Sequence, residues 1–230
     1  MKYAFAVTIL ILLSSLQGSA VLSVFAQGDE RQVGIEVGVP VKKLSSLPDG
    51  SNFKQNDNGG FGNDVILGGR FHMPVSDFMS LRASIDYQQA SQIFLAPTDQ
   101  MTVSGEAWLY FTGKPSDTNK TWVRPFVFGG MQQDMLVGTT DATQAFGGFG
   151  INVSTVAGTR VIPKVHYTTH QLGGSQTAFG QEYNASVELQ FDLGKSGFAF
   201  GIEPFVARFE PVPGFYATKA GASLIIWRKF

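Results

Sequence analysis

The sequence predicts an all-β fold: a closed up-and-down antiparallel transmembrane β-barrel of ten strands. Three observations lead to this prediction. Large apolar residues alternate with polar or small ones along most of the chain, and this period of two is typical of strands with two different faces. The alternating segments are about ten residues long, which is the length of a strand that crosses a bilayer. The connections between them alternate between long and short, as expected when every hairpin turns at one of two rims.

Composition excludes several other classes of protein. Of the 230 residues 43% are hydrophobic and only 15% are charged, which is below the usual quarter and too apolar for a disordered chain. The absence of cysteine excludes a disulfide scaffold and a cysteine metal site. With 17 basic and 18 acidic residues there is no basic surface for nucleic acid, so we expect no nucleic-acid partner.

The first 26 residues have the organisation of an export signal. Lys2 gives a positive start, residues 3–13 are apolar, and Val24-Phe25-Ala26 forms a small-x-Ala cleavage site before Gln27. The alternative is an uncleaved membrane anchor that runs to Ala26. We expect cleavage, which leaves residues 27–230 as one outer-membrane barrel domain that binds no cofactor.

The first four predicted strands each carry one apolar face. They are residues 33–41, 61–73, 79–88 and 101–111. In the first, Val33, Ile35 and Val37 oppose Gly34 and Glu36. The other three strands also have large apolar residues on one face and polar or small residues on the other.

The middle of the chain contains one ambiguous strand. Residues 122–131 are apolar on both sides, so their periodicity does not indicate which face is which. In residues 145–153, Phe149 and Ile151 oppose Gly148, Gly150 and Asn152.

The last four predicted strands are again amphipathic. They are residues 161–170, 182–192, 198–206 and 217–230. The second of them alternates most regularly, with Tyr183, Ala185 and Val187 opposite Asn184 and Ser186.

The connections fall into two classes. The long polar ones are residues 42–60, 90–100, 132–143, 171–181 and 209–216, and the shorter ones are residues 74–78, 113–121, 154–159 and 193–197. In an outer-membrane barrel the long connections lie outside the cell and the short ones in the periplasm. Residues 42–60 are the longest and richest in turn residues, which makes them the candidate surface loop.

Alternation alone does not decide whether the apolar face meets lipid or a core. The polar faces carry charges of both signs among small residues, as in a narrow wet lumen. The predicted ionic network of the lumen consists of Glu36, Asp64, Arg70, Arg82, Asp86, Glu106, Lys164, Glu188, Asp192, Glu203 and Lys219. The opposite arrangement, a secreted lipocalin-like barrel with an apolar interior, is the soluble alternative.

Aromatic residues of the apolar face gather at strand ends, as in the two girdles of a membrane barrel. One group lies toward the long connections: Phe61, Tyr87, Tyr167 and Tyr183. The other lies toward the short turns: Phe71, Phe111, Phe191, Phe198 and Phe230.

The chain resembles the small outer-membrane barrels of the OmpA/OmpX type in four features. These are the export signal, the meander of amphipathic strands, the stretch Pro125-Phe126-Val127-Phe128-Gly129-Gly130 and the terminal Phe230. The resemblance implies a monomer in the outer membrane of a Gram-negative cell, surrounded by lipid that includes lipopolysaccharide. The commonest barrel of that family has eight strands, so eight is the alternative to ten.

In that family the outer-membrane assembly machinery reads an aromatic last strand. The resemblance assigns this assembly signal to Leu224, Ile226 and Phe230. Arg228 departs from the pattern, because an apolar residue is usual two positions before the end; it has to extend toward the periplasmic head groups.

We expect the lumen to be filled by side chains, because a barrel of eight to ten strands has little interior space. The function that remains is structural or one of surface interaction through the extracellular loops. A narrow porin-like channel for small solutes is the alternative.

An enzymatic alternative rests on Val165-His166-Tyr167-Thr168-Thr169-His170 and the later Glu182. This stretch resembles the His-x-Ser segment and acid of the lipid A 3-O-deacylase barrels. The resemblance would make His166 the base, Thr168 the nucleophile in place of serine, and Glu182 the residue that orients the histidine. The alternation turns His166 and Thr168 away from lipid, so we expect no deacylation and no catalytic residues.

Two other chemistries are not expected. His166 and His170 lie about 13 Å apart on a strand, too far for one metal. An omptin-like protease also has a ten-stranded barrel, but the Asp-Asp and Asp-His pairs of that family do not occur in this sequence.

Overall fold

The computed structural model describes residues 31–46, 52–53, 65–90, 98–114, 121–136, 142–155, 158–171, 179–212 and 215–230. The predicted signal peptide and Asp64 lie outside the described residues. The strands are β1 Gln32–Ser46, β2 Asn52–Phe53, β3 Ile66–Ser76, β4 Met79–Ala90, β5 Thr98–Tyr110, β6 Trp122–Leu136, β7 Ala142–Ser154, β8 Thr159–Gln171, β9 Phe179–Asp192, β10 Phe198–Val212 and β11 Phe215–Lys229.

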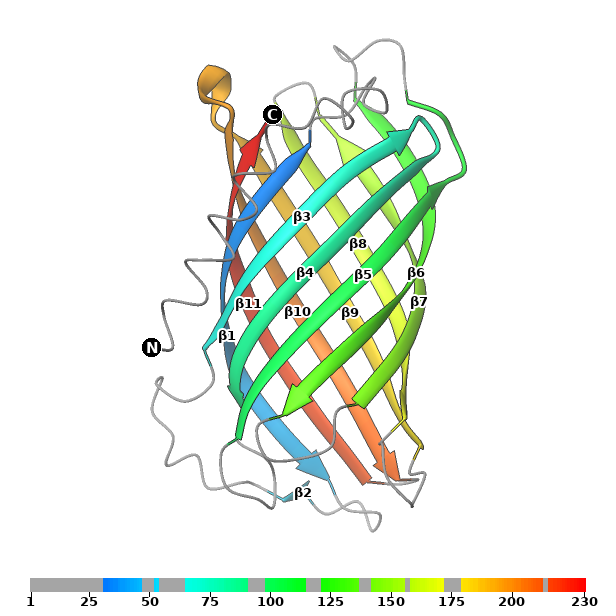
Figure 1. The fold of residues 1–230 in the computed structure, drawn as a ribbon, viewed down its shortest axis with the longest axis vertical. Coiled ribbons are helices and arrows are strands. Elements are labelled where there is room, and N and C mark those ends of the chain that lie inside the picture. Colours follow the sequence, from blue (N-terminus) through cyan, green and yellow to red (C-terminus); the bar gives the residue numbers. More distant parts are fainter. Residues whose placement is uncertain are drawn as a thin grey trace.

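Ten of these strands form a closed antiparallel barrel (Figure 1). Each strand pairs with its neighbour in sequence, and β1 closes the ring by pairing with β11, where Ile35 lies opposite Ile226. The two-residue β2 pairs only with the end of β1. The prediction of a ten-stranded up-and-down barrel is confirmed, and the eight-stranded alternative is wrong.

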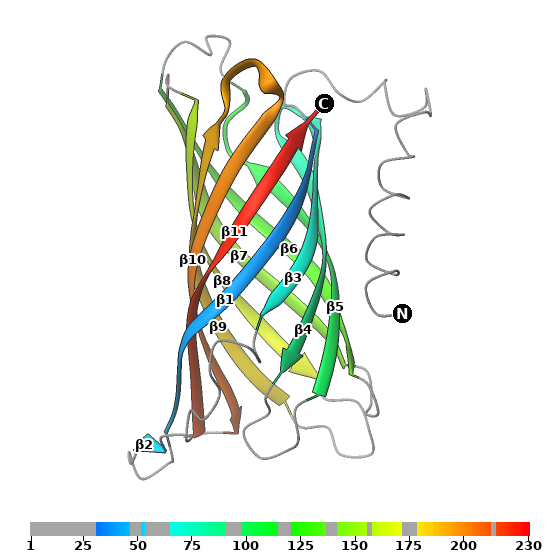
Figure 2. The ribbon, with the colours of Figure 1, turned by 90° about the vertical axis from the view of Figure 1, so that its left-hand side faces the viewer.

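The barrel has two different rims. At the short-turn rim β1 begins and β11 ends (Figure 2), and the Phe230 amide donates to the Arg31 carbonyl oxygen at 2.9 Å. The same rim carries the turn at Asp77 and Phe78 and a short 3-10 helix, Gly194–Ser196. The opposite rim, where β1 ends, is called the long-connection rim.

The strands extend further toward the long-connection rim than predicted. β1 continues to Ser46 and β6 to Leu136, so the predicted connections 42–60 and 132–143 start too early. β10 and β11 stay paired as far as Val212 and Phe215, so the predicted long connection 209–216 is mostly strand. The reason is that strands past the apolar band keep their hydrogen-bonded ladder but lose the alternation that identifies them.

In the described part of the chain, no helix has the length and hydropathy needed to span a membrane.

Candidate functional site

The wall of the barrel has opposite polarity on its two sides. In β1, Gln32 and Glu36 are 2% and 3% exposed, whereas Ile35 and Val37 are 48% and 41% exposed. The same alternation holds in β11, where Ser223 is buried and Leu224 is exposed. The predicted facing of these strands is confirmed: Glu36 and Ser223 point into the lumen, and Ile35 and Leu224 point out. In β11 the large apolar Ile225 and Trp227 are also buried on the lumen side.

The centre of the lumen holds a buried ion-pair cluster. Arg70 on β3 forms salt bridges with Glu36 on β1 and Glu203 on β10. Lys164 Nζ on β8 lies 3.0 Å from Glu203 Oε1, and the Ser186 hydroxyl on β9 donates to the same carboxylate at 2.8 Å. Five strands are thus joined across the lumen through charges that compensate one another.

A second ion pair lies beside this cluster. Arg82 Nη1 on β4 is 2.9 Å from Glu188 Oε2 on β9, and the Glu188 side chain is fully buried. Arg82 Nε also donates to His72 Nδ1 at 3.1 Å. The guanidinium lies 3.7 Å from the centre of the Trp108 ring, so one cation is held by a carboxylate and an aromatic face together.

Toward the long-connection rim the described residues of the lumen include a hydrogen-bonded polar group around Asp134. Asp134 on β6 accepts hydrogen bonds from Thr102 at 2.7 Å, Gln132 at 3.1 Å and Gln144 at 2.6 Å. Sequence reasoning missed Asp134 because it placed residues 132–143 in a connection.

The predicted ionic residues are distributed over several contacts. Glu36, Arg70, Arg82, Lys164, Glu188 and Glu203 make the ion pairs described above. Asp86 accepts from the Ser84 hydroxyl at 3.0 Å, and Lys219 donates to Gln88 at 3.1 Å. Glu106 lies opposite Arg82 in the β4–β5 register, and Asp192 pairs with Lys229 at 2.5 Å near the short-turn rim.

The short-turn half of the lumen is filled differently, by an aromatic block. Its members are Trp108, Tyr110, Phe126, Phe128 and Ile162, all buried, with Phe146 packed against them. The Trp108 and Phe126 rings stack with centroids 4.1 Å apart and an angle of 8° between planes.

Arg124 fixes one end of this block. Its guanidinium lies 3.8 Å from the centre of the Tyr110 ring, and it donates to the carbonyl oxygens of Thr112 and Asp77 at the rim. Arg124 and the two inward phenylalanines of β6 were not predicted, because residues 122–131 are apolar on both faces.

A smaller apolar cluster of Ala199, Ile225 and Trp227 fills the other side of the same half. It requires a glycine on β1: a Cβ at Gly34 would lie 2.7 Å from Cε3 of Trp227. The barrel therefore accommodates this indole only because Gly34 has no side chain.

The candidate catalytic residues of the enzymatic alternative lie on adjacent strands. Thr168 is 4% exposed on the lumen side of β8 and lies opposite Glu182, while His166 lies opposite Asn184. The His166 ring packs on Phe128 and Phe146, with centroids 5.9 and 5.8 Å apart. Val165 and Tyr167 face outward with 37% and 36% exposure, so the wall separates Thr168 from the outer surface of the barrel.

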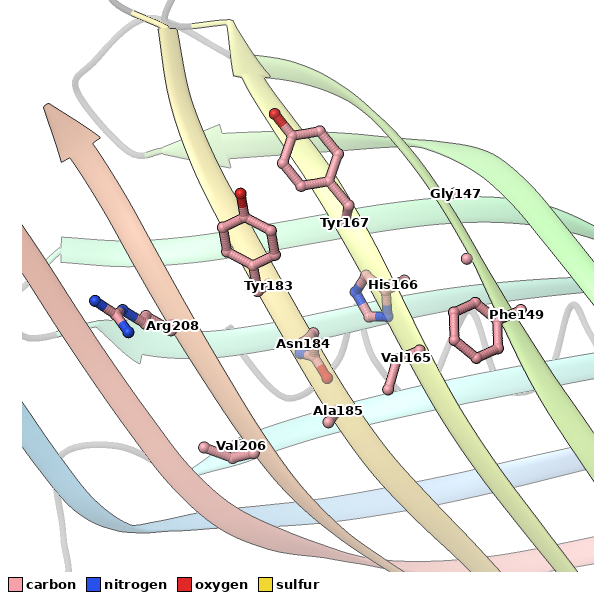
Figure 3. A pocket seen from close by; sticks show the side chains of 11 residues that line it. Gly147, Phe149, Val165, His166, Tyr167, Tyr183, Asn184, Ala185, Val206 and Arg208 are labelled. Atoms are coloured by element: carbon pink, nitrogen blue, oxygen red, sulfur yellow. The ribbon is translucent and has the colours of Figure 1, made fainter. Parts of the chain in front are cut away.

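The outer wall carries a groove of about 470 Å³ across β7, β8, β9 and β10 (Figure 3). The outward side chains that line it include Phe149, Tyr167, Tyr183, Val206 and Arg208. Sequence reasoning placed Tyr167 and Tyr183 in an outward girdle but did not predict a groove.

The predicted assembly-signal residues Leu224, Ile226 and Phe230 are 50%, 57% and 53% exposed on the outer wall. Arg228 turns toward the short-turn rim: its guanidinium lies 4.7 Å from the centre of the Phe198 ring and donates to the Ser196 carbonyl oxygen at 3.1 Å.

No protein-family model matches the chain, and no curated protein sequence matches it. Among solved structures it is similar to the outer membrane protease OmpT from Escherichia coli, with 9% identity and a TM-score of 0.47 over 88% of this chain and 97% of that one. It is also similar to the translocator domain of the autotransporter NalP from Neisseria meningitidis, with 9% identity and a TM-score of 0.39 over 94% and 96%.

Proposed function

We propose that the chain is an integral outer-membrane β-barrel protein whose lumen is closed by its own side chains and whose role is structural or one of surface interaction. The observation that supports this most is the inverted polarity of the wall. Strands such as β3 and β1, of 11 and 15 residues, span about 25–35 Å when tilted by about 45°, enough for the apolar layer of a bilayer.

The polarity argues against a lipocalin-like barrel in water. Exposed side chains such as Leu109 at 51%, Met131 at 61% and Phe149 at 63% would form a large apolar surface, which soluble monomers avoid. Conversely, the ion pairs of Arg70 and Arg82 occupy the interior where a lipocalin has its apolar cavity.

The purified protein tests this placement directly. It should need detergent to stay dispersed, and the folded barrel should migrate differently on a gel before and after heating. A protein that remains compact and dispersed without detergent would support the lipocalin-like alternative instead.

The same proposal holds that the barrel is no general pore, because the aromatic block and the ion pairs occupy the lumen. Reconstituted in a planar bilayer, the protein should give no conductance steps of porin size. Regular steps of that size would favour the channel alternative.

We further expect the surface role to be carried by the long-connection rim, which on this orientation faces outward from the cell. The candidate surface loop is then narrower than predicted, since Lys42–Ser46 belong to β1. Removing residues 54–60 should leave heat-modifiable migration unchanged, and loss of that migration would show that the segment is needed for the barrel itself.

The proposed assembly signal can be tested in cells. Phe230→Ala should lower the amount of barrel in the outer membrane, whereas Phe198→Ala, an outward aromatic on β10, should change it less. Equal effects would mean that the terminal position has no special role.

Lipid A deacylation remains the enzymatic alternative, and the inward, buried position of Thr168 speaks against it. We expect no release of ester-linked acyl chains from lipid A in detergent. Hydrolysis that disappears in His166→Ala would establish the alternative.

A further inference from the structure

A lumen-facing cation at the short-turn end has no counter-charge among the described residues. Arg160 lies at the start of β8, on the same inward side as the buried Ile162 and Thr168. Within the part of the chain that the structure describes, its side chain makes no ion pair and no hydrogen bond. The inward carboxylates of the neighbouring strand β9 at this level already have cations of their own. Glu188 pairs with Arg82 and Asp192 pairs with Lys229.

Two buried N–H donors lie near this cation. Gln190 on β9 is opposite both Arg160 on β8 and Gly201 on β10, and it donates to Gln32 Oε1 at 3.2 Å. The Gln32 Nε2 group is buried without a hydrogen-bond partner among the described residues, and so is Trp227 Nε1. The indole nitrogen reaches the same place, because a Cβ at Gly201 would lie 3.3 Å from it. The cation and both donors thus surround Gln190.

This group of residues lies between the aromatic block and the short-turn rim. His72 is opposite Gln32 in the β1–β3 register, and its ring centroid is 6.3 Å from that of Trp108 in the block. Because His72 Nδ1 accepts a hydrogen bond from Arg82, its ring carries the hydrogen on Nε2, which is a further donor. Toward the rim the Asp192 side chain is 30% exposed, so water reaches the group from the short-turn end.

The chemistry of these groups indicates an anion with several oxygen atoms. Guanidinium and indole groups only donate hydrogen bonds, and the amide oxygen of Gln32 is already used by Gln190. Buried donors without acceptors are unfavourable, and a guanidinium binds phosphate or carboxylate oxygens through two parallel N–H groups. Since the donors come from different strands around Gln190, a tetrahedral oxyanion satisfies more of them than the two oxygens of a carboxylate.

We propose that the short-turn end of the lumen binds one small oxyanion of the phosphate class, either free phosphate or a soluble phosphate monoester, at Arg160, Gln32 and Trp227. The anion supplies the counter-charge that the protein does not give to Arg160. The aromatic block beyond His72 stops it from passing through the barrel. The site opens to the periplasm on the orientation proposed above, and only this part of the inference rests on the proposed function.

Two substitutions remove the site in different ways. Arg160→Gln takes away the cation. Gln190→Glu places a carboxylate directly opposite Arg160, so that the protein supplies its own counter-charge. The matched control is Arg228→Gln, which removes an exposed arginine of the outer wall at the same rim. All three substitutions change the net charge by the same amount.

The test is isothermal titration calorimetry of the detergent-solubilised full-length protein with inorganic phosphate, and separately with acetate, at constant ionic strength. The wild type should bind one phosphate per barrel, and acetate about tenfold more weakly or less. Arg160→Gln and Gln190→Glu should each weaken phosphate binding about tenfold or more, whereas Arg228→Gln should bind as the wild type does. Phosphatidylglycerol added to the micelles should not displace phosphate, because the site lies inside the wall.

The proposal is wrong if the wild type binds no phosphate, if acetate binds equally well, or if Arg160→Gln and Arg228→Gln have equal effects. Displacement by phosphatidylglycerol would overturn it in favour of a lipid head group. Each sample is also checked for heat-modifiable migration, and if one site variant does not fold, the other decides. A wild type that keeps this migration but binds no phosphate refutes the site alone, whereas loss of the migration in the wild type refutes the membrane placement.

Discussion

The two halves of the lumen are filled by different chemistry. At the short-turn half the aromatic block packs ring on ring, with Trp108 stacked on Phe126 at 4.1 Å. In the other half, which begins at the centre of the lumen and is called the ion-pair half, Glu203 compensates two cations, Arg70 and Lys164. The comparison shows that one barrel can close its interior by dispersion and shape in one half and by charge compensation in the other.

Buried polar atoms without a hydrogen-bond partner in the protein occur in both halves. Within the described residues they include Asp86 Oδ1 and Gln144 Oε1, but also Trp108 Nε1 in the aromatic block and Trp227 Nε1 in the smaller apolar cluster. Such atoms usually bind internal water, so they do not distinguish the halves. We infer that the aromatic block is the barrier in the lumen because its rings stack closely.

The largest expected effect breaks this barrier. Trp108→Ala combined with Phe126→Ala removes the stacked pair and should convert a silent barrel into one that shows small conductance steps in a planar bilayer. Glu203→Gln, in the ion-pair cluster, should stay silent. Steps in Glu203→Gln and none in the double variant would reverse the roles of the two halves.

A smaller effect concerns stability in the aromatic half. Trp108→Ala alone should lower the free energy of unfolding by about 4 kcal/mol, because it leaves a cavity and removes the ring beneath Arg82. Urea unfolding in detergent measures it. The outward Leu109→Ala on the same strand is the control; if it costs as much as Trp108→Ala, packing in the lumen is not what stabilises this half.

The smallest effect concerns the ion-pair half. Glu203→Gln should lower the free energy of unfolding by about 3 kcal/mol. The reason is that Arg70 and Lys164 then have too little negative charge near them in a buried site. Adding Lys164→Gln should recover part of that loss, whereas Asp77→Asn in the exposed turn should have no measurable effect. If the double variant loses more free energy of unfolding than Glu203→Gln and Lys164→Gln lose when their separate losses are added, charge compensation is not the cause.

Much of the fold could be predicted because the outer side of the wall is apolar along most of the barrel. An apolar outer surface opposite a polar or small inner face imposes a period of two on strands such as β1, so the facing of residues such as Ile35 and Glu36 can be deduced from local sequence alone. The strand ends could not be deduced in this way, since the pattern fades where the strands leave the apolar layer.

The contents of the lumen were harder to predict. Arg70 and Glu203 are 133 positions apart, and their contact depends on the stagger of strands around the ring, which local sequence does not contain. One observation could have indicated which residues of β6 face inward. Trp108 and Tyr110 on β5 are inward, and in the β5–β6 hairpin Phe128 and Phe126 lie opposite them. The groove required the registers of four strands, so only its individual outward residues could be deduced.

The central claim is that the apolar side of the wall faces lipid, and adjacent residues on β11 test it most directly. Because the chain has no cysteine, single cysteines can be introduced at Ser223 and Leu224 and spin-labelled in reconstituted vesicles. We expect that oxygen, which concentrates in the bilayer, relaxes the label at Leu224 strongly and the label at Ser223 weakly. Strong oxygen relaxation at Ser223 with a water-accessible label at Leu224 would contradict it.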